Sequence, residues 1–136
     1  MPKKKKNNFT YSSGKRRTAS ARIRLFKGKG ESLVNGKALS EYFPGKIMES
    51  LYTRPFKLTD TFEKYYFTAK IAGGGKNGQL EALVHGISKA LSDLDREKFR
   101  IPLKKAGLLV RDSRIRERRK VGMGGKARRK KQSPKR

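Results

Sequence analysis

The stretch FEKYYFTAKIAGGGKNGQLEALVHGISKALSDL, residues 62–94, joins two hydrophobic patterns through a run rich in glycine. Its first part, Phe62–Ile71, alternates with the period of a β-strand that buries one face. Its last part, from about Gln79 to Leu94, has the i, i+3, i+4, i+7 spacing of an amphipathic helix. The apolar positions are Tyr65, Phe67, Ala69 and Ile71 in the strand, and Leu80, Leu83, Val84, Ile87, Leu91 and Leu94 in the helix. A strand and a helix that each need to bury one side predict helix-on-sheet packing.

A second alternating segment, Arg17–Phe26, predicts another long strand, with one buried face and one cationic face. The buried face holds Ala19, Ala21, Ile23 and Leu25, and the other face holds Arg16, Ser20, Arg22 and Arg24. A short β-prone segment, Phe9–Ser12, precedes Gly14 and predicts a further strand or strand edge. In a chain this basic we expect the cationic face to contact phosphate; the alternative is a solvated surface.

Shorter elements complete the domain. They are a strand at Ser32–Val34 closed by the turn Asn35-Gly36, a helical turn at Ala38–Phe43, a short helix from Pro44 to about Tyr52, and a helix from near Asp95 to Gly107. The order predicts an α+β fold, a two-layer sandwich in which helices cover one face of a small mixed sheet. We expect a basic arm at residues 1–8, a globular domain at 9–110 and a long basic extended tail at 111–136.

Positive charge dominates the chain, with 37 Lys or Arg against 11 Asp or Glu and a net charge of +26 over 136 residues. Residues 111–136 hold 13 of the cations, two acids and almost no large apolar side chain. Such a segment buries too little to offset its ordering entropy alone, which favours a strongly anionic partner. Nucleic acid is therefore the expected ligand, either structured RNA or, as for a histone-like protein, duplex DNA.

Several protein classes are excluded on composition. No stretch reaches the roughly 18 apolar residues of a spanning helix, so we expect no membrane partner. The arm Lys3–Lys6 is followed by Asn7-Asn8 and not by an apolar signal-peptide core; it is interpreted as a phosphate-binding arm, with a nuclear import signal as the alternative. The absence of cysteine excludes disulfides and thiolate metal sites, and we expect no cofactor.

The glycine run has two interpretations. Gly73, Gly75 and Gly78 match the dinucleotide-binding spacing G-x-G-x-x-G. A dinucleotide-binding fold needs a second parallel strand after the helix, but here a second helix is predicted instead, and too little chain remains for a doubly wound sheet. The backbone N–H groups and Lys76 suit an RNA phosphate instead, and the alternative is that the glycines permit a tight turn and close packing. A lone His85 and unpaired acids offer no catalytic constellation, so we expect no enzyme.

Motifs in order along the chain resemble the small-subunit ribosomal protein nine family, in its bacterial and organellar form. They begin with the segment 14–25, GKRRTASARIRL, and with Gly28-Lys29-Gly30 and Val34-Asn35-Gly36. They continue with Gly73-Gly74-Gly75, His85-Gly86-Ile87, the segment 103–109, LKKAGLL, Arg111-Asp112, Lys126-Ala127-Arg128 and Lys135-Arg136. The chain departs from the family at Val84, where a basic residue is usual, and at Val110, Ser113 and Ser133-Pro134.

The resemblance implies a structural protein of the small-subunit head, on cytoplasmic or organellar ribosomes. It implies binding to the three-prime major domain of 16S-type ribosomal RNA (rRNA), beside proteins seven, ten and fourteen, and a tail that reaches toward peptidyl-site transfer RNA (tRNA). The expected rRNA-binding residues are Lys15, Arg16, Arg17, Arg22, Arg24, Lys76, Arg111, Arg114, Arg118, Arg119, Lys120 and Lys126. The expected tRNA-proximal residues are Arg128, Arg129, Lys135 and Arg136.

Overall fold

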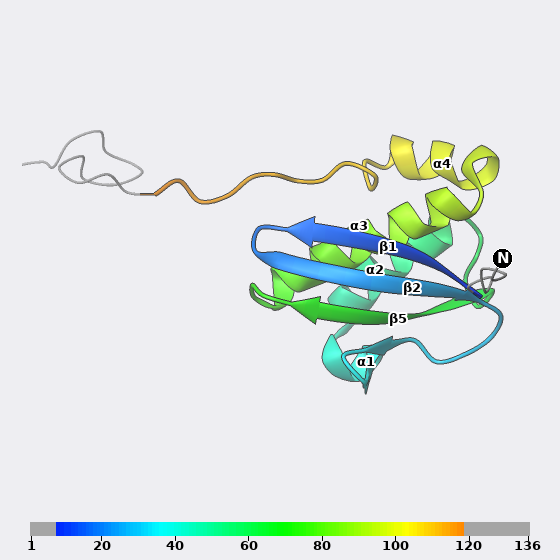
Figure 1. The fold of residues 1–136 in the computed structure, drawn as a ribbon, viewed down its shortest axis with the longest axis horizontal. Helices are drawn as coiled ribbons and strands as arrows, with labels where there is room; N and C mark the ends of the chain where they lie inside the picture. Colours follow the sequence, from blue (N-terminus) through cyan, green and yellow to red (C-terminus); the bar gives the residue numbers. More distant parts are fainter. Residues whose placement is uncertain (1–7, 119–136) are drawn as a thin grey trace, which may run out of the picture.

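The computed structural model describes residues 8–118, which fold as one sheet with helices packed against it (Figure 1). The strands are β1 (Phe9–Arg16), β2 (Ala19–Lys27), β3 (Leu33–Val34), β4 (Lys37–Ala38) and β5 (Tyr65–Ala72). The helices are α1 (Leu39–Tyr42), α2 (Lys46–Leu58), α3 (Lys76–Leu94) and α4 (Arg96–Lys105). The order of elements agrees with the sequence prediction except for the short strand β4, which was not predicted.

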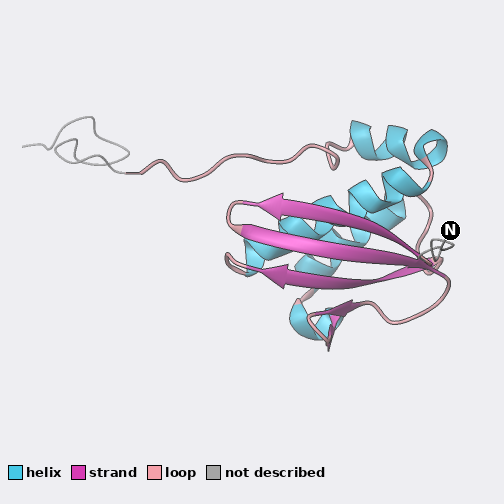
Figure 2. Cartoon of the chain, viewed as in Figure 1, coloured by secondary structure: helices cyan, strands magenta, loops and turns pink. Residues whose placement is uncertain are grey.

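The sheet has the strand order β1-β2-β5-β3-β4 and is mixed. β1, β2 and β5 pair antiparallel, whereas the short β3 pairs parallel with β5 and antiparallel with β4. The helix α3 crosses behind β1 and β2, and α2 and α4 pack against α3 (Figure 2). Among residues 8–118, no helix lies on the other face of the three long strands (Figure 2). The predicted two-layer α+β sandwich is therefore confirmed.

The core lies between the sheet and α3. In β2 every second side chain is buried, as predicted, and the buried set is Ala19, Ala21, Ile23 and Leu25. Leu83, Ile87 and Leu91 of α3 pack against this face and are fully buried. Small residues where the layers meet bring them unusually close together. A Cβ atom added to Gly14 would lie 2.0 Å from the carbonyl oxygen of Ala82, in the backbone of α3.

Several element boundaries differ from the prediction. β5 begins at Tyr65 and not at Phe62, and α3 begins at Lys76 and not near Gln79. Gly14 lies inside β1, which continues to Arg16, because its missing side chain serves helix packing and not a turn. The two-residue turn falls at Arg17-Thr18 instead. The helix α2 runs past Tyr52 to Leu58 with Pro55 inside it. Proline removes one backbone hydrogen bond from a helix, but Pro55 and Phe56 are buried against the core and favour the continued helix.

Both ends of α4 match the predicted boundaries. Asp95 caps the N-terminus, where its side chain accepts a hydrogen bond from the backbone N–H of Lys98 at 3.2 Å. Gly107 ends the helix with a φ of +73°, a left-handed conformation that suits glycine. The chain then places Leu108 and Leu109 against the core, and Asp112 and Arg114 contact Arg16 at the end of β1. Beyond them the described chain extends away from the domain (Figure 1).

Candidate nucleic-acid interface

Cations gather on the face of the sheet that no helix of the described chain covers, called here the open face. Arg22 and Arg24 of β2 and Lys70 of β5 are exposed there, and Arg22 lies directly opposite Lys70 in the strand register. Like charges at directly opposed positions destabilise a sheet in the absence of a counter-charge. No Asp or Glu pairs with these three residues within the part of the chain that the structure describes. The open face therefore presents uncompensated positive charge.

A shallow hollow of about 400 Å³ crosses the open face. Its floor comes from the long strands, and the β3–β4 hairpin contributes Leu33, Asn35 and Gly36 to its lining. On β1, Tyr11 lies opposite Arg24 and exposes 56% of its surface. Phe9, Phe26 and Tyr66 form an aromatic row beyond it, and the Arg24 guanidinium lies 5.2 Å from the Phe9 ring centre. The hollow thus combines cations with exposed ring surface, the combination that binds phosphates and unpaired bases.

Arg16 does not share this face, and the prediction that groups it with Arg22 and Arg24 is wrong. Arg16 is the last residue of β1, and the turn at Arg17-Thr18 separates it from β2. The turn shifts the inward–outward alternation of side chains by one residue between β1 and β2. The even-numbered Ser12, Gly14 and Arg16 of β1 therefore lie on the helix-covered face. Only 6% of its surface is exposed.

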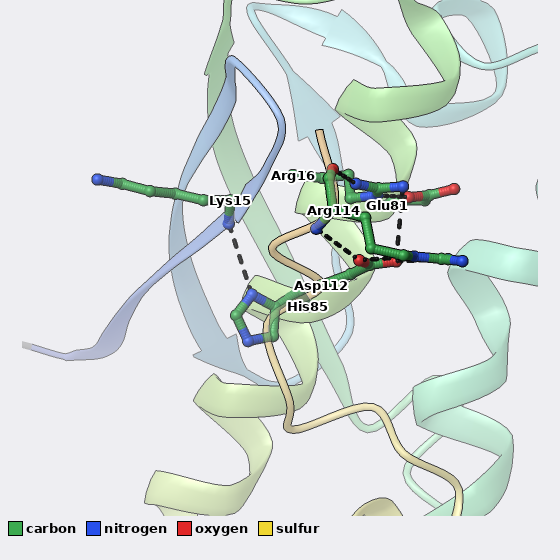
Figure 3. Close-up of polar contacts among 6 residues, drawn as sticks. All are labelled: Lys15, Arg16, Glu81, His85, Asp112 and Arg114. Atoms are coloured by element: carbon green, nitrogen blue, oxygen red, sulfur yellow. Dashed lines mark hydrogen bonds and ion pairs between the residues drawn. The ribbon is translucent and has the colours of Figure 1, made fainter. Parts of the chain in front are cut away.

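Buried there, the Arg16 guanidinium has three partners (Figure 3). Its Nε donates to Glu81 at 2.5 Å, one terminal nitrogen donates to the Arg114 carbonyl oxygen at 2.6 Å, and the other lies 3.5 Å from Asp112 Oδ2. Asp112 in turn accepts hydrogen bonds from the guanidinium and the backbone N–H of Arg114. These hydrogen bonds, with the nearby Arg16 charge, hold the pKa of Asp112 well below its usual range. We call these four residues the tail-root cluster.

The glycine loop supports close packing. Gly73 and Gly74 adopt positive φ values, and a Cβ atom on Gly73 would lie 2.5 Å from the carbonyl oxygen of Thr18 in the β1–β2 turn. Neighbouring long strands run antiparallel, so this is not the parallel sheet of a dinucleotide-binding fold. The predicted phosphate ligand Lys76 points toward α1: its ammonium lies 3.4 Å from the Tyr42 ring centre and donates to the Tyr42 carbonyl oxygen at 3.2 Å.

His85 lies on α3 beside the tail-root cluster and is half-buried. Its Nδ1 accepts a long hydrogen bond, 3.5 Å, from the backbone N–H of Lys15, whereas the Lys15 side chain points away (Figure 3). Burial lowers the pKa of His85, and the positive charges of Lys89 and Arg111 lower it further against an opposing contribution from the Leu109 backbone. A neutral imidazole that accepts from a strand N–H joins β1 to α3.

Comparison with known proteins decides the family. Residues 14–136 match the family described as ribosomal protein S9/S16. The chain belongs to this family. The small ribosomal subunit protein uS9 of Desulfotalea psychrophila is 52% identical over 115 residues, which are 85% of this chain and 88% of that protein. Proteins of the same name from Maridesulfovibrio salexigens and Rickettsia rickettsii are each 46% identical, over 87% and 99% of this chain and 90% and 85% of their own lengths.

The family resemblance predicted from the ordered motifs is thus confirmed. The chain is a ribosomal protein and not an enzyme, as the sequence predicts. No cluster of three or more metal-ligating side chains occurs among residues 8–118. No helix within that range is both long and apolar enough to cross a membrane.

The remaining predicted contact residues of this ribosomal protein fall into three groups. Lys15 is exposed on the open face, and Arg17 is exposed in the β1–β2 turn, where it lines a depression with the glycine loop. Arg111 and Arg118 are exposed on the segment that leaves the domain, and Arg114 is exposed but paired with Asp112. Outside the described residues lie the Lys3–Lys6 arm and Arg119, Lys120, Lys126, Arg128, Arg129, Lys135 and Arg136.

Two features of the interface were missing from the sequence prediction of this ribosomal protein. Lys70 is exposed like Arg22. The alternation of β5 places it on the face opposite to the one that holds the buried Ala69 and Ile71, so that pattern alone could have identified it. The partners of Arg16 could not be found in this way. Glu81 and Asp112 lie 65 and 96 positions away from Arg16, and no local pattern connects them.

Proposed function

We propose that this ribosomal protein is a structural constituent of the small-subunit head that binds rRNA through the open face and the basic tail. The observation that carries the proposal is the opposed pair Arg22 and Lys70, with Arg24 beside it and no acidic partner in the described residues. A phosphate backbone supplies the missing counter-charge. Each neutralised phosphate also releases condensed counterions, so that binding becomes strongly salt-dependent.

The proposed organisation has three parts. Residues 9–110 form the rRNA-binding domain, residues 1–8 add a basic arm, and residues 111–136 form a tail with a net charge of +11. The burial of apolar side chains in the first part and their scarcity in the third support this division. The family resemblance adds that the domain sits in the head near proteins seven, ten and fourteen.

The tail is proposed to reach toward peptidyl-site tRNA, with Lys135 and Arg136 at its tip and Arg128 and Arg129 on the same path. Chain length supports this reach: 25 extended steps of about 3.3 Å span roughly 80 Å. A 100-residue domain has a radius of gyration of only about 13 Å. A basic tail of this length therefore brings charge to a site that its domain does not touch.

Reconstitution tests the two parts of the proposal separately. Small subunits that lack the protein are mixed with the full chain or with a chain ending at Pro134, and protein uptake and tRNA binding are measured. We expect both chains to co-sediment with the subunit, because two charges are a small part of the tail. Only the full chain should restore peptidyl-site tRNA affinity, since a charge-assisted hydrogen bond contributes about 1.5–3 kcal/mol. Equal tRNA affinity would leave the tip without a role, and failure to co-sediment would contradict the rRNA-binding function.

A histone-like DNA-binding protein is the competing proposal, because it would share the charge. Competition between duplex DNA and a fragment of the rRNA head, at equal phosphate concentration and equal salt, separates the two. The protein should bind the rRNA head fragment more tightly than duplex DNA, because the hollow beside Tyr11 suits an unpaired base that duplex DNA does not offer. Preference for duplex DNA would favour the histone-like function.

A further inference from the structure

The position of Arg16 is unusual for a cation in this chain, because its charge is internal. The side chain is buried, and its three groups of donors reach one residue of α3 and two residues that follow the domain. The tail-root cluster holds two positive and two negative side chains, so its formal charge is zero in a chain whose net charge is +26. Each of the three guanidinium nitrogens thus faces a partner within the chain, and only 6% of the Arg16 surface is exposed to an RNA phosphate.

The acid in this cluster is equally unusual. Asp112 is one of only two acids in residues 111–136. A carboxylate there opposes phosphate binding, so an RNA-binding role does not explain it. Its partners do: Asp112 bridges Arg16 of the domain and Arg114 of the departing segment. The carboxylate therefore joins the first residues of the tail to the end of β1.

We propose that Arg16 is a positioning residue that fixes the direction in which the basic tail leaves the domain. The guanidinium ties the Arg114 carbonyl and the Asp112 carboxylate to Glu81 on α3, so the segment after Leu109 starts along one path. The inference rests on the proposed function in one respect: a tail that must enter a distant site gains affinity when its root already points there. If, without the contacts to Arg16, the first residues of the tail take the binding direction about one tenth of the time, the apparent affinity falls about tenfold.

Asp112→Asn distinguishes this role from simple electrostatics by the sign of the effect. Removing a negative charge near RNA should strengthen binding to subunits that lack the protein. Loss of the positioning ion pair should weaken binding instead, by about tenfold if the first residues of the tail then take the binding direction about one tenth of the time. Glu117→Gln is the matched control, because it removes the same charge from an exposed position five residues further along. It should leave affinity unchanged or raise it.

Arg16→Lys supplies the second variant, since it keeps the charge but loses the planar fork that reaches several partners at once. If Arg16 bound phosphate, lysine would preserve most of the affinity and the salt slope. The positioning role predicts that Arg16→Lys weakens binding as much as Asp112→Asn does, and that the double variant is no weaker than either. Urea unfolding of Asp112→Asn should show only a small loss of stability, because Asp112 lies outside the domain core although its ion pair with Arg16 is removed.

The free protein provides a test that needs no ribosome. The chain has no cysteine, so Arg118→Cys offers a single site for a nitroxide label. Its paramagnetic broadening of domain amide signals should be confined to one side of the domain. In Arg16→Lys or Asp112→Asn the broadening should spread to amides that were unaffected. An identical pattern in all three chains would overturn the positioning role, as would stronger subunit binding by Asp112→Asn. Failure of every chain to bind subunits, with the broadening changed as expected, would count against the proposed function alone.

Discussion

The two faces of the β1–β2–β5 sheet are built from the same strands and behave in opposite ways. On the helix-covered face, small and aliphatic side chains bring α3 so close that Gly14 has no room for a methyl group. On the open face, Arg22, Arg24 and Lys70 stand together without acidic partners among the described residues. The covered face stabilises the fold, whereas like charges on the open face oppose one another. The comparison supports the proposal that binding uses the side of the sheet opposite to the one that forms the core.

Arg16 sharpens this comparison, because it is a cation on the covered face. Six positions before Arg22 in the chain, Arg16 is buried and paired with Glu81 and Asp112, whereas Arg22 is exposed. Arginine thus has partners within the chain on the covered face, whereas on the open face it has no acidic partner among the described residues. Burial and partners, more than charge, decide which role an arginine takes.

The largest expected effect comes from breaking the covered face with Gly14→Ala. The added methyl group would clash with the backbone of α3 at Ala82 and Gly86, so the layers must separate. We expect a loss of about 3 kcal/mol in the free energy of unfolding, measured by urea denaturation. Gly78→Ala is the control, because a Cβ atom there meets only ordinary neighbours at 3.7 Å or more. Within α3 it should gain about 0.5–1 kcal/mol from helix propensity. Equal effects at both glycines would refute the close-packing account.

Neutralising the open face should have two effects of opposite sign. The triple variant Arg22→Gln, Arg24→Gln, Lys70→Gln removes the like-charge pairing, so the free protein should gain about 0.5 kcal/mol of stability at low salt. Its log–log salt slope for binding to the rRNA head should fall by roughly 0.7–0.9 for each phosphate that is no longer neutralised, or about two in total.

A matched triple variant tests whether position matters in addition to charge. Lys46→Gln, Lys57→Gln and Lys98→Gln remove three exposed charges from the helices α2 and α4. Filter binding should show a slope close to that of the unsubstituted chain. If both triple variants reduce the slope equally, the RNA responds to net charge and the open face is an ordinary solvated surface.

Lys76, the first residue of α3, tests a cation that has an internal aromatic partner. Replacing it with Gln should cost about 0.5–1 kcal/mol of stability, because the cation–π interaction with Tyr42 is removed. Tyr42→Leu should cost more, because it also removes the hydrogen bond from the Tyr42 hydroxyl to Gln79 at 2.8 Å, and the double variant should be little worse than Tyr42→Leu alone. The RNA salt slope should change less than it does for Arg22→Gln alone. A full reduction of the slope by about 0.7–0.9 would instead support Lys76 as a phosphate ligand, as the sequence predicts.

The smallest effect concerns His85, where β1 meets α3. Burial holds its pKa in the folded protein below the ordinary value of 6.5, so the unfolded chain takes up the proton first as pH falls. The resulting stability is complete above about pH 7.5 and declines as pH falls through 6.5. His85→Asn should flatten the stability curve between pH 7.5 and pH 5.5, measured by urea unfolding at each pH. Asp112 contributes only in a separate window, below its ordinary pKa of 3.8, so it leaves this range unaffected. An unchanged curve would place the pH dependence elsewhere.

Most of the fold was predictable because its signals are local. The alternation in β2 and β5 and the apolar stripe of α3 each lie within twenty residues, and all three were found. The errors concern the packing of distant segments. Gly14 resembles a turn glycine until α3 is placed against it, and the end of α2 depends on what Pro55 and Phe56 are buried against. Local patterns carry no information about such partners.

The same division applies to the candidate site. By itself the sequence determined that the chain is basic, that Arg22 and Arg24 share one strand face, and that the tail cannot form a core, because charge and periodicity are properties of the chain order alone. Only the tertiary structure decided that Arg16 turns inward, that Lys70 stands opposite Arg22, and that Lys76 points to Tyr42. The physical reason is that a two-residue turn resets the alternation and that electrostatic pairing depends on distances of a few ångströms. Those distances exist only after residues far apart in the chain, such as Arg16 and Glu81, have been brought together.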